Sequence, residues 1–261
     1  MRMDTGRILA TLRDRDLVPD QCQAAFLVGS TARGWSNKKS DLDICVVSAE
    51  PWSFPDSVEV AVSLEPDVVH WHTFHADNRD WDLAYWVDAQ VDQMLTKISW
   101  AEYDQVRATS NDVLPPREES FLGRIATCVP LIGEDWVARR RAELDASAFR
   151  SVLVTRSLGA ADRAIEDGLG QLADGDLHSA VISARLAYGH TVDALLEERG
   201  EYGSYHFKWR PRRFQAAQPE ALTFDEYWAV ETMRDFDPDD PKKWINKVLT
   251  ACQDLALKVK V

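Results

Sequence analysis

The sequence predicts an α+β fold in which a mixed β-sheet domain flanked by helices precedes an all-α helical bundle. In the first part of the chain, apolar residues recur with both strand and helix periods. After the stretch NDVLPPREES (residues 111–120), where two prolines separate a polar loop from a possible helix cap, the pattern is almost purely helical. We therefore place a domain boundary near Asp112, between domains of residues 1–112 and 113–261.

The N-terminal half contains several short segments with clear periodicity. Residues 6–17 have helical spacing, residues 24–30 form a short apolar strand that ends in a turn, and residues 41–48 alternate as a strand with one buried face. Residues 67–87 predict two strands joined by the turn Asp77-Asn78-Arg79, a hairpin signal. Residues 88–98 return to helix.

Helical periodicity dominates the C-terminal half. The predicted helices cover residues 117–129, 134–144, 147–172, 176–199, 223–234 and 241–258. The longest interruption is the irregular stretch of residues 200–220.

Composition limits the classes of function. A net charge of −13 repels polyanions, so we expect a small-molecule partner, cationic molecules included, rather than nucleic acid. The four cysteines are scattered without a CxxC pair, which indicates reduced thiols rather than a disulfide framework or a zinc site. The apolar runs are too short for a membrane span and the N-terminus is charged, so we expect a cytoplasmic protein.

Most of the chemical information lies between residues 26 and 47. Gly29 and Ser30 end the first strand, where glycine allows backbone N–H groups to turn outward toward phosphate oxygens. Asp41 and Asp43 stand two apart on the next strand and project to the same side, while the apolar residues between and after them bury. Two adjacent carboxylates repel unless a cation lies between them, and oxygen ligands favour Mg²⁺.

A third carboxylate is expected from the hairpin. The alternation of residues 81–87 places Asp82 on one face, with Leu83 on the other. The hairpin can bring the face of Asp82 beside the first two aspartates. Asp80 and Asp88 are the alternative acids.

This order of elements resembles the nucleotidyltransferase superfamily, which includes DNA polymerase beta and the aminoglycoside nucleotidyltransferases. The matching residues are VGS, a spacer of ten residues, DLDI, and a strand-borne WDLAYW. The resemblance covers about residues 24–88, a third of the chain, and implies a nucleotidyltransferase-fold sheet. The helical half is similar only in kind to the helical domain of the antibiotic-modifying members.

The resemblance implies specific residue roles. Gly29 and Ser30 would hold the terminal phosphates, and Asp41 and Asp43 would bind two Mg²⁺ ions. Asp82 would complete the site of the ion that activates the acceptor oxygen. Arg33 follows Ser30 by three residues, as an arginine does in some antibiotic-modifying relatives, and is a candidate phosphate contact.

A basic and aromatic cluster interrupts the helical half. Lys208 is a candidate phosphate contact, and Arg210, Arg212 and Arg213 stand close to it in sequence among aromatic residues. The alternative is a solvated basic loop whose aromatics pack on the bundle. His70, His72 and His75 have spacing that suits a transition metal, but half-exposed hairpin histidines are the simpler interpretation.

The function implied is Mg²⁺-dependent transfer of AMP, from ATP, to a hydroxyl of a small molecule such as an aminoglycoside, another antibiotic or a biosynthetic intermediate, with release of pyrophosphate. We expect a monomer or homodimer that binds neither nucleic acid nor membrane. The alternative is a nucleotidyltransferase-like antitoxin or sensor that binds or AMPylates a protein. Two further alternatives are a ribonuclease based on Arg185 and His190, and RNA tailing.

Overall fold

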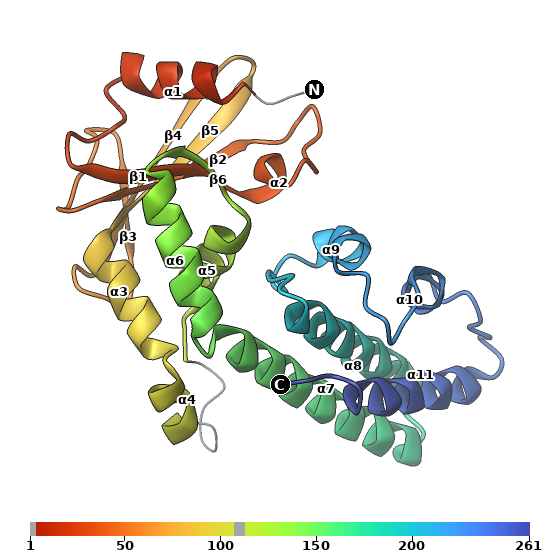
Figure 1. Ribbon diagram of the computed structural model, residues 1–261. Helices are drawn as coiled ribbons and strands as arrows, with labels where there is room; N and C mark the ends of the chain where they lie inside the picture. Colours follow the sequence, from red (N-terminus) through yellow and green to blue (C-terminus); the bar gives the residue numbers. More distant parts are fainter. Residues whose placement is uncertain (1–3, 107–112) are drawn as a thin grey trace. The chain divides into compact units, whose positions relative to one another are not determined.

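The computed structural model describes residues 4–106 and 113–261, which form two compact units (Figure 1). The N-terminal unit is Met1–Ala148 and the C-terminal unit is Phe149–Val261. The boundary that the sequence predicts near Asp112 lies outside the described residues. The division after Ala148 assigns two further helices and a strand to the N-terminal unit, because that strand pairs with the sheet.

A six-stranded mixed sheet forms the centre of the N-terminal unit. Its strand order is β3-β4-β5-β2-β1-β6. The pair β2 and β5 is parallel, whereas the other neighbouring pairs are antiparallel. The strands are β1 (Cys22–Leu27), β2 (Leu42–Ser48), β3 (Val58–Ala61), β4 (Val68–Ala76), β5 (Arg79–Val87) and β6 (Val129–Ile132).

The β4–β5 hairpin follows the sequence prediction. Asp77 and Asn78 both have positive φ, at 52° and 58°, and connect the two strands. Positive φ at both central residues is the conformation of a type I′ turn, whose twist matches that of paired strands. Arg79, which the sequence assigned to the turn, is the first residue of β5.

Helices cover both faces of the sheet. Helix α1 (Thr5–Asp14) contributes Ile8 and Leu12 to a core that includes Leu42, Ile44 and Leu83. On the opposite face, Phe26 stacks on Trp136 of α6 (Glu134–Ala146), and Trp86 packs against Phe121 of α5 (Pro116–Thr127). The unit also contains α2 (Gly29–Ala32), α3 (Asp88–Lys97) and α4 (Trp100–Val106).

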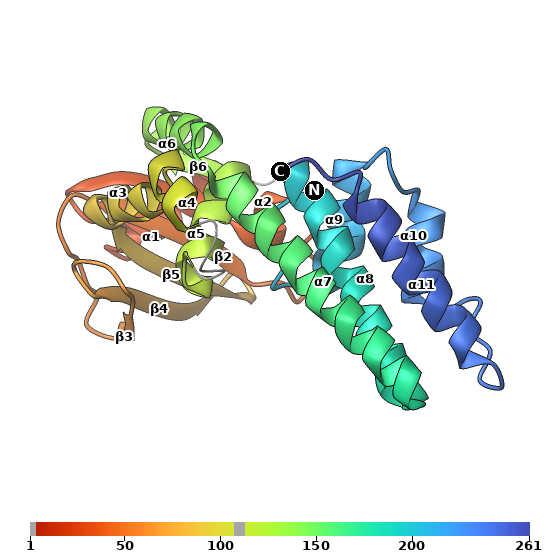
Figure 2. The same ribbon diagram turned by 90° about the horizontal axis from the view of Figure 1, so that it is seen from below.

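Long helices form the C-terminal unit. Helices α7 (Phe149–Asp174), α8 (Leu177–Glu198) and α11 (Pro241–Ala256) lie side by side in both views (Figures 1 and 2). Shorter elements complete the unit: the 3₁₀ turn η1 (Phe207–Trp209), α9 (Arg210–Ala217) and α10 (Phe224–Glu231). Tyr188, Phe214 and Leu249 are among the residues of its apolar core.

The main departures from the predicted elements are short. Strand β6 interrupts the half predicted as helical, and its Pro130 fits an edge strand, where a missing N–H is tolerated. Helix α9 lies inside the predicted irregular stretch and carries a proline in its first turn, a favoured position. None of the helices within residues 4–106 and 113–261 has the length and apolar character needed to cross a bilayer.

Candidate active site

Two of the predicted carboxylates stand next to each other on neighbouring strands. Asp43 of β2 is the register partner of Asp82 of β5, and both side chains are half-buried. Adjacent strands lie about 4.8 Å apart, so residues in register on one face are direct neighbours. Leu42 and Ile44 bury on the opposite face, as the alternation predicts. The parallel pairing thus brings together residues that are 39 positions apart in the sequence.

The glycine turn packs directly against Asp43. Gly29 has φ +65°, and a Cβ placed there would lie within 2.4 Å of Asp43 Oδ2. Only glycine fits this position without displacing the carboxylate or the turn, since L-residues avoid the left-handed region and no room exists for a side chain. The turn and the carboxylate therefore form one continuous surface.

Two hydrogen bonds fasten this turn to the aspartate segment. The Val28 backbone N–H donates to the carbonyl of Asp43 at 3.0 Å. The buried Thr31 hydroxyl donates to the carbonyl of Asp41 at 3.3 Å. Sequence reasoning did not single out Thr31, although its position directly after the Gly-Ser pair is the signal that would have found it.

The third predicted ligand, Asp41, is exposed and directly precedes β2. No group of three or more His, Cys, Asp or Glu side chains in residues 4–106 and 113–261 is arranged as a metal site. The structure therefore brings Asp43 and Asp82 together but does not gather Asp41 with them. The donor set nevertheless suits Mg²⁺, because carboxylate oxygens on a glycine-lined surface are its preferred ligands.

Arg33 lies at the end of the turn. It is half-buried, and its guanidinium carbon is 4.0 Å from the centroid of the Trp35 ring. Such a cation–π contact restrains the arginine near Ser30. Trp35 N–H also donates to the Ser30 carbonyl at 2.8 Å, which fixes the loop that carries both residues.

The comparisons agree with this geometry. A family model described as "Nucleotidyltransferase domain" matches residues 8–89, which include the glycine turn and all three aspartates. This N-terminal unit carries a nucleotidyltransferase domain. Its general chemistry is therefore nucleotidyl transfer, and the chain is a nucleotidyltransferase enzyme.

A solved structure shares the fold of this nucleotidyltransferase. It is a nucleotidyltransferase-like protein from Exiguobacterium sibiricum, similar with a TM-score of 0.50 and 11% sequence identity. The match covers 97% of this chain and 74% of the other. No curated protein matches the sequence.

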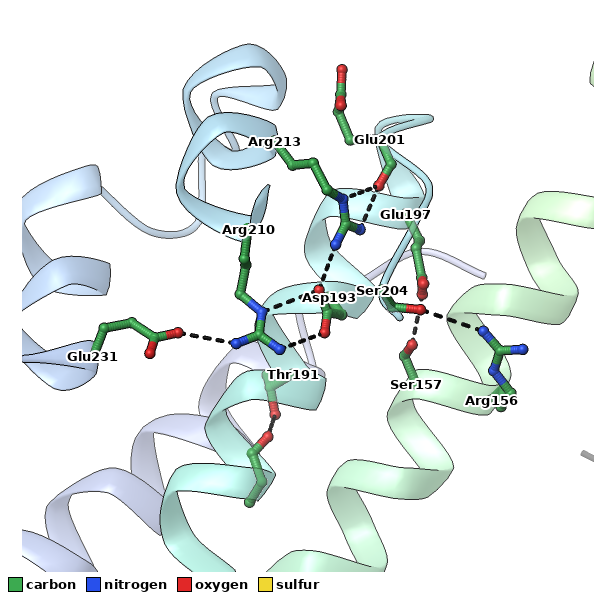
Figure 3. A network of polar contacts seen from close by, with 11 residues as sticks. Arg156, Ser157, Thr191, Asp193, Glu197, Glu201, Ser204, Arg210, Arg213 and Glu231 are labelled. Atoms are coloured by element: carbon green, nitrogen blue, oxygen red, sulfur yellow. Dashed lines mark hydrogen bonds and ion pairs between the residues drawn. The ribbon is translucent and has the colours of Figure 1, made fainter. Parts of the chain in front are cut away.

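Two arginines of the basic cluster form buried ion pairs within the C-terminal unit. Arg210 and Arg213 are buried, and both bind Asp193 of α8, through contacts of 2.8 and 2.7 Å (Figure 3). Arg210 also pairs with Glu231 at 3.1 Å. Lys208 lies in η1, with its ammonium 5.5 Å from the Trp209 ring centroid.

A second buried carboxylate adjoins this network. Glu197 is fully buried one helical turn after Asp193, and Ser157 donates to its Oε2 at 2.7 Å. Its Oε1 has no hydrogen-bond partner. Burial raises the pKa of Glu197 to about 8, and the charge of Asp193 adds to this effect, whereas Arg213 opposes it.

The hairpin histidines have separate environments. His72 is buried with its ring 4.5 Å from that of Phe54, and His70 is half-buried. His75 is exposed, and its Nδ1 lies 2.8 Å from Asp80 Oδ1. Alternate residues of β4 point to opposite faces, so His70 and His72 share a face that His75 does not. The prediction of half-exposed histidines is therefore right for His70 and wrong for His72, which is buried, and for His75, which is exposed.

Proposed function

We propose that this nucleotidyltransferase transfers AMP from ATP to a hydroxyl of a small molecule, with release of pyrophosphate. The observation that carries the proposal is the surface made by Asp43, Asp82 and the Gly29 turn. It places two carboxylates on neighbouring strands, and that of Asp43 lies against the glycine of the turn. Such a surface suits a metal-bound triphosphate better than any apolar ligand.

Each residue has a defined role in the proposal. Gly29 and Ser30 hold the terminal phosphates, and Arg33, restrained by Trp35, adds a charged contact. Asp41, Asp43 and Asp82 hold two Mg²⁺ ions, and bound Mg²⁺ supplies charge neutralisation and lowers the pKa of an acceptor hydroxyl. The hydrogen bonds from the Val28 backbone N–H and the Thr31 hydroxyl keep the Gly29 turn and the aspartate segment in fixed relation. The protein thus orients the reactants and stabilises charge.

The C-terminal unit has the proposed role of selecting the acceptor. Lys208 is the exposed cation of η1 that we propose as a phosphate contact, since Arg210 and Arg213 are engaged by Asp193. The net charge of −13 favours a cationic acceptor such as an aminoglycoside. The acceptor is expected to carry a hydroxyl beside amino groups.

The experiment is a transfer assay with labelled nucleoside triphosphates. The protein is incubated with Mg²⁺, each of the four nucleoside triphosphates in turn, and a panel of aminoglycosides and lincosamides. We expect pyrophosphate release that requires both ATP and a small acceptor, and its loss in Asp43→Ala. Label on a co-purified protein and on no small molecule would instead establish the alternative, a protein-modifying antitoxin or sensor.

A further inference from the structure

Thr73 lies in line with the two neighbouring carboxylates. It is the register partner of Asp82 across the β4–β5 hairpin, and Asp82 is in turn the partner of Asp43. Residues directly opposite one another in a sheet share a face. The three residues therefore form a row across β4, β5 and β2, with Asp82 in the middle.

A hydrogen bond joins Thr73 to Asp82. The threonine hydroxyl donates to Asp82 Oδ1 at 3.0 Å. A β-branched side chain on a strand has few χ1 rotamers, so the backbone of β4 fixes the position of this hydroxyl. The terminal torsion of an aspartate is broad when nothing restrains it. The bond therefore limits rotation of the Asp82 carboxylate, and it engages Oδ1.

The same hairpin contains a comparable contact that does not involve a predicted metal ligand. His75 contacts Asp80 two residues nearer the turn, and the two side chains are 64% and 62% exposed. Asp82, by contrast, is half-buried and next to Asp43. Of these two cross-strand contacts, the one made by Thr73 is placed to act on the candidate active site.

We propose that Thr73 is a positioning residue that orients the Asp82 carboxylate for metal binding. This inference rests on the proposed function, in which Asp82 is a metal ligand. Hydrogen-bond partners that orient metal ligands contribute about 10-fold to 100-fold in metal affinity, because they remove the cost of ordering the ligand. Thr73 acts through Asp82 and touches neither metal nor substrate itself.

The test compares Thr73→Val with Thr73→Ser. Valine keeps the β-branched shape and the strand propensity but has no donor, whereas serine keeps the donor. Mn²⁺ serves as the probe, and its binding is titrated by electron paramagnetic resonance in the presence of a non-hydrolysable ATP analogue, so that no turnover is needed. We expect Thr73→Val to weaken Mn²⁺ binding about 10-fold or more, and Thr73→Ser to stay within about 2-fold of the wild type.

Two further variants make the outcomes distinct. His75→Gln removes the neighbouring contact on the same strand and should leave Mn²⁺ binding unchanged. Asp82→Ala should weaken it more than Thr73→Val does. Unchanged binding in Asp82→Ala refutes the metal role of Asp82, and with it this part of the proposed function. If Asp82→Ala weakens binding and Thr73→Val does not, the positioning role alone is wrong. Equal losses of Mn²⁺ affinity in Thr73→Val and Thr73→Ser would also overturn the positioning role of the Thr73 hydroxyl.

Discussion

Aspartates occupy two contrasting environments in this protein. In the C-terminal unit, Asp193 is 1% exposed and binds two buried arginines. In the N-terminal unit, Asp43 and Asp82 are half-buried and neighbour each other, and Asp43 lies against Gly29. A carboxylate surrounded by guanidinium groups contributes to the fold, whereas like charges held together on an accessible surface are suited to a ligand cation. The same residue type thus stands in a structural setting in one unit and in the setting of our proposed metal site in the other.

Replacement of Asp82, like that of Asp43, is expected to have a large effect on activity. Replacing it with alanine removes one of the neighbouring carboxylates, so transfer should fall by roughly a hundredfold to a thousandfold. The melting temperature should change by less than about 2 °C, since the side chain contributes little packing. Asp80→Ala on the same strand is the matched control and should retain activity. Full activity in Asp82→Ala, or loss of activity in Asp80→Ala, would contradict the role of Asp82 as a metal ligand.

The largest effect on stability is expected at Asp193. Its replacement by alanine leaves Arg210 and Arg213 buried without their shared partner, which should lower the free energy of unfolding by about 3 to 5 kcal/mol. Urea denaturation measures this change. Arg212→Ala, at an exposed position of α9 between Arg210 and Arg213, should shift the unfolding midpoint little. A stability loss at Arg212 as large as that at Asp193 would contradict the structural role of the ion pairs.

Gly29→Ala tests the contact between the turn and Asp43. The new Cβ would meet Asp43 Oδ2 at 2.4 Å, and the residue has φ +65°. Gly34 provides a close control, since it has φ +67° but no atom within 4 Å of an added Cβ. Both variants share a backbone penalty of about 1 to 2 kcal/mol. We expect only Gly29→Ala to reduce transfer, by about tenfold or more. Equal kinetics in the two variants would show that this contact has no role.

A pH dependence of stability is expected from Glu197. Its pKa is about 8 in the folded protein and 4.5 in the reference state, so the folded state binds more protons between these values. The free energy of unfolding should therefore fall as pH rises from about 4.5 to 8, by on the order of 1 kcal/mol per pH unit. Glu197→Gln should remove this slope in urea denaturation at pH 5 and pH 8, while Glu198→Gln should keep it. A slope that persists in Glu197→Gln would show that another group causes the pH dependence of stability.

Local sequence patterns and the family resemblance predicted the N-terminal carboxylates well. Alternation in residues 41–48 and 81–87 placed Asp43 and Asp82 on defined faces, and the parallel pairing of β2 with β5 confirms that they are neighbours. The surroundings of Arg210 were not predictable in the same way. Its partner Asp193 is 17 residues earlier on another helix, so only tertiary packing shows that the two meet. The sequence around Arg210 therefore indicates only a basic cluster, either solvated or ligand-binding.

The extent of the N-terminal unit also depends on tertiary pairing that local sequence does not show. Strand β6 has four residues, one of them proline, and such a segment carries almost no strand signal. Its pairing with β1 nevertheless attaches residues 129–132 to the sheet, and the compact unit extends to Ala148. The metal role of Asp41 stays a prediction, since its side chain is exposed and directly precedes β2.

The two edge strands of the sheet affect the tendency of this protein to aggregate at high concentration. The edge strands β3 and β6 are each only four residues long. Glu59 lies in one, and Pro130, which has no N–H to offer a neighbouring chain, lies in the other. Short edges with a charge or a proline are poor templates for adding a strand from another molecule. Strand exchange and fibrillar growth through the edge strands β3 and β6 are therefore disfavoured.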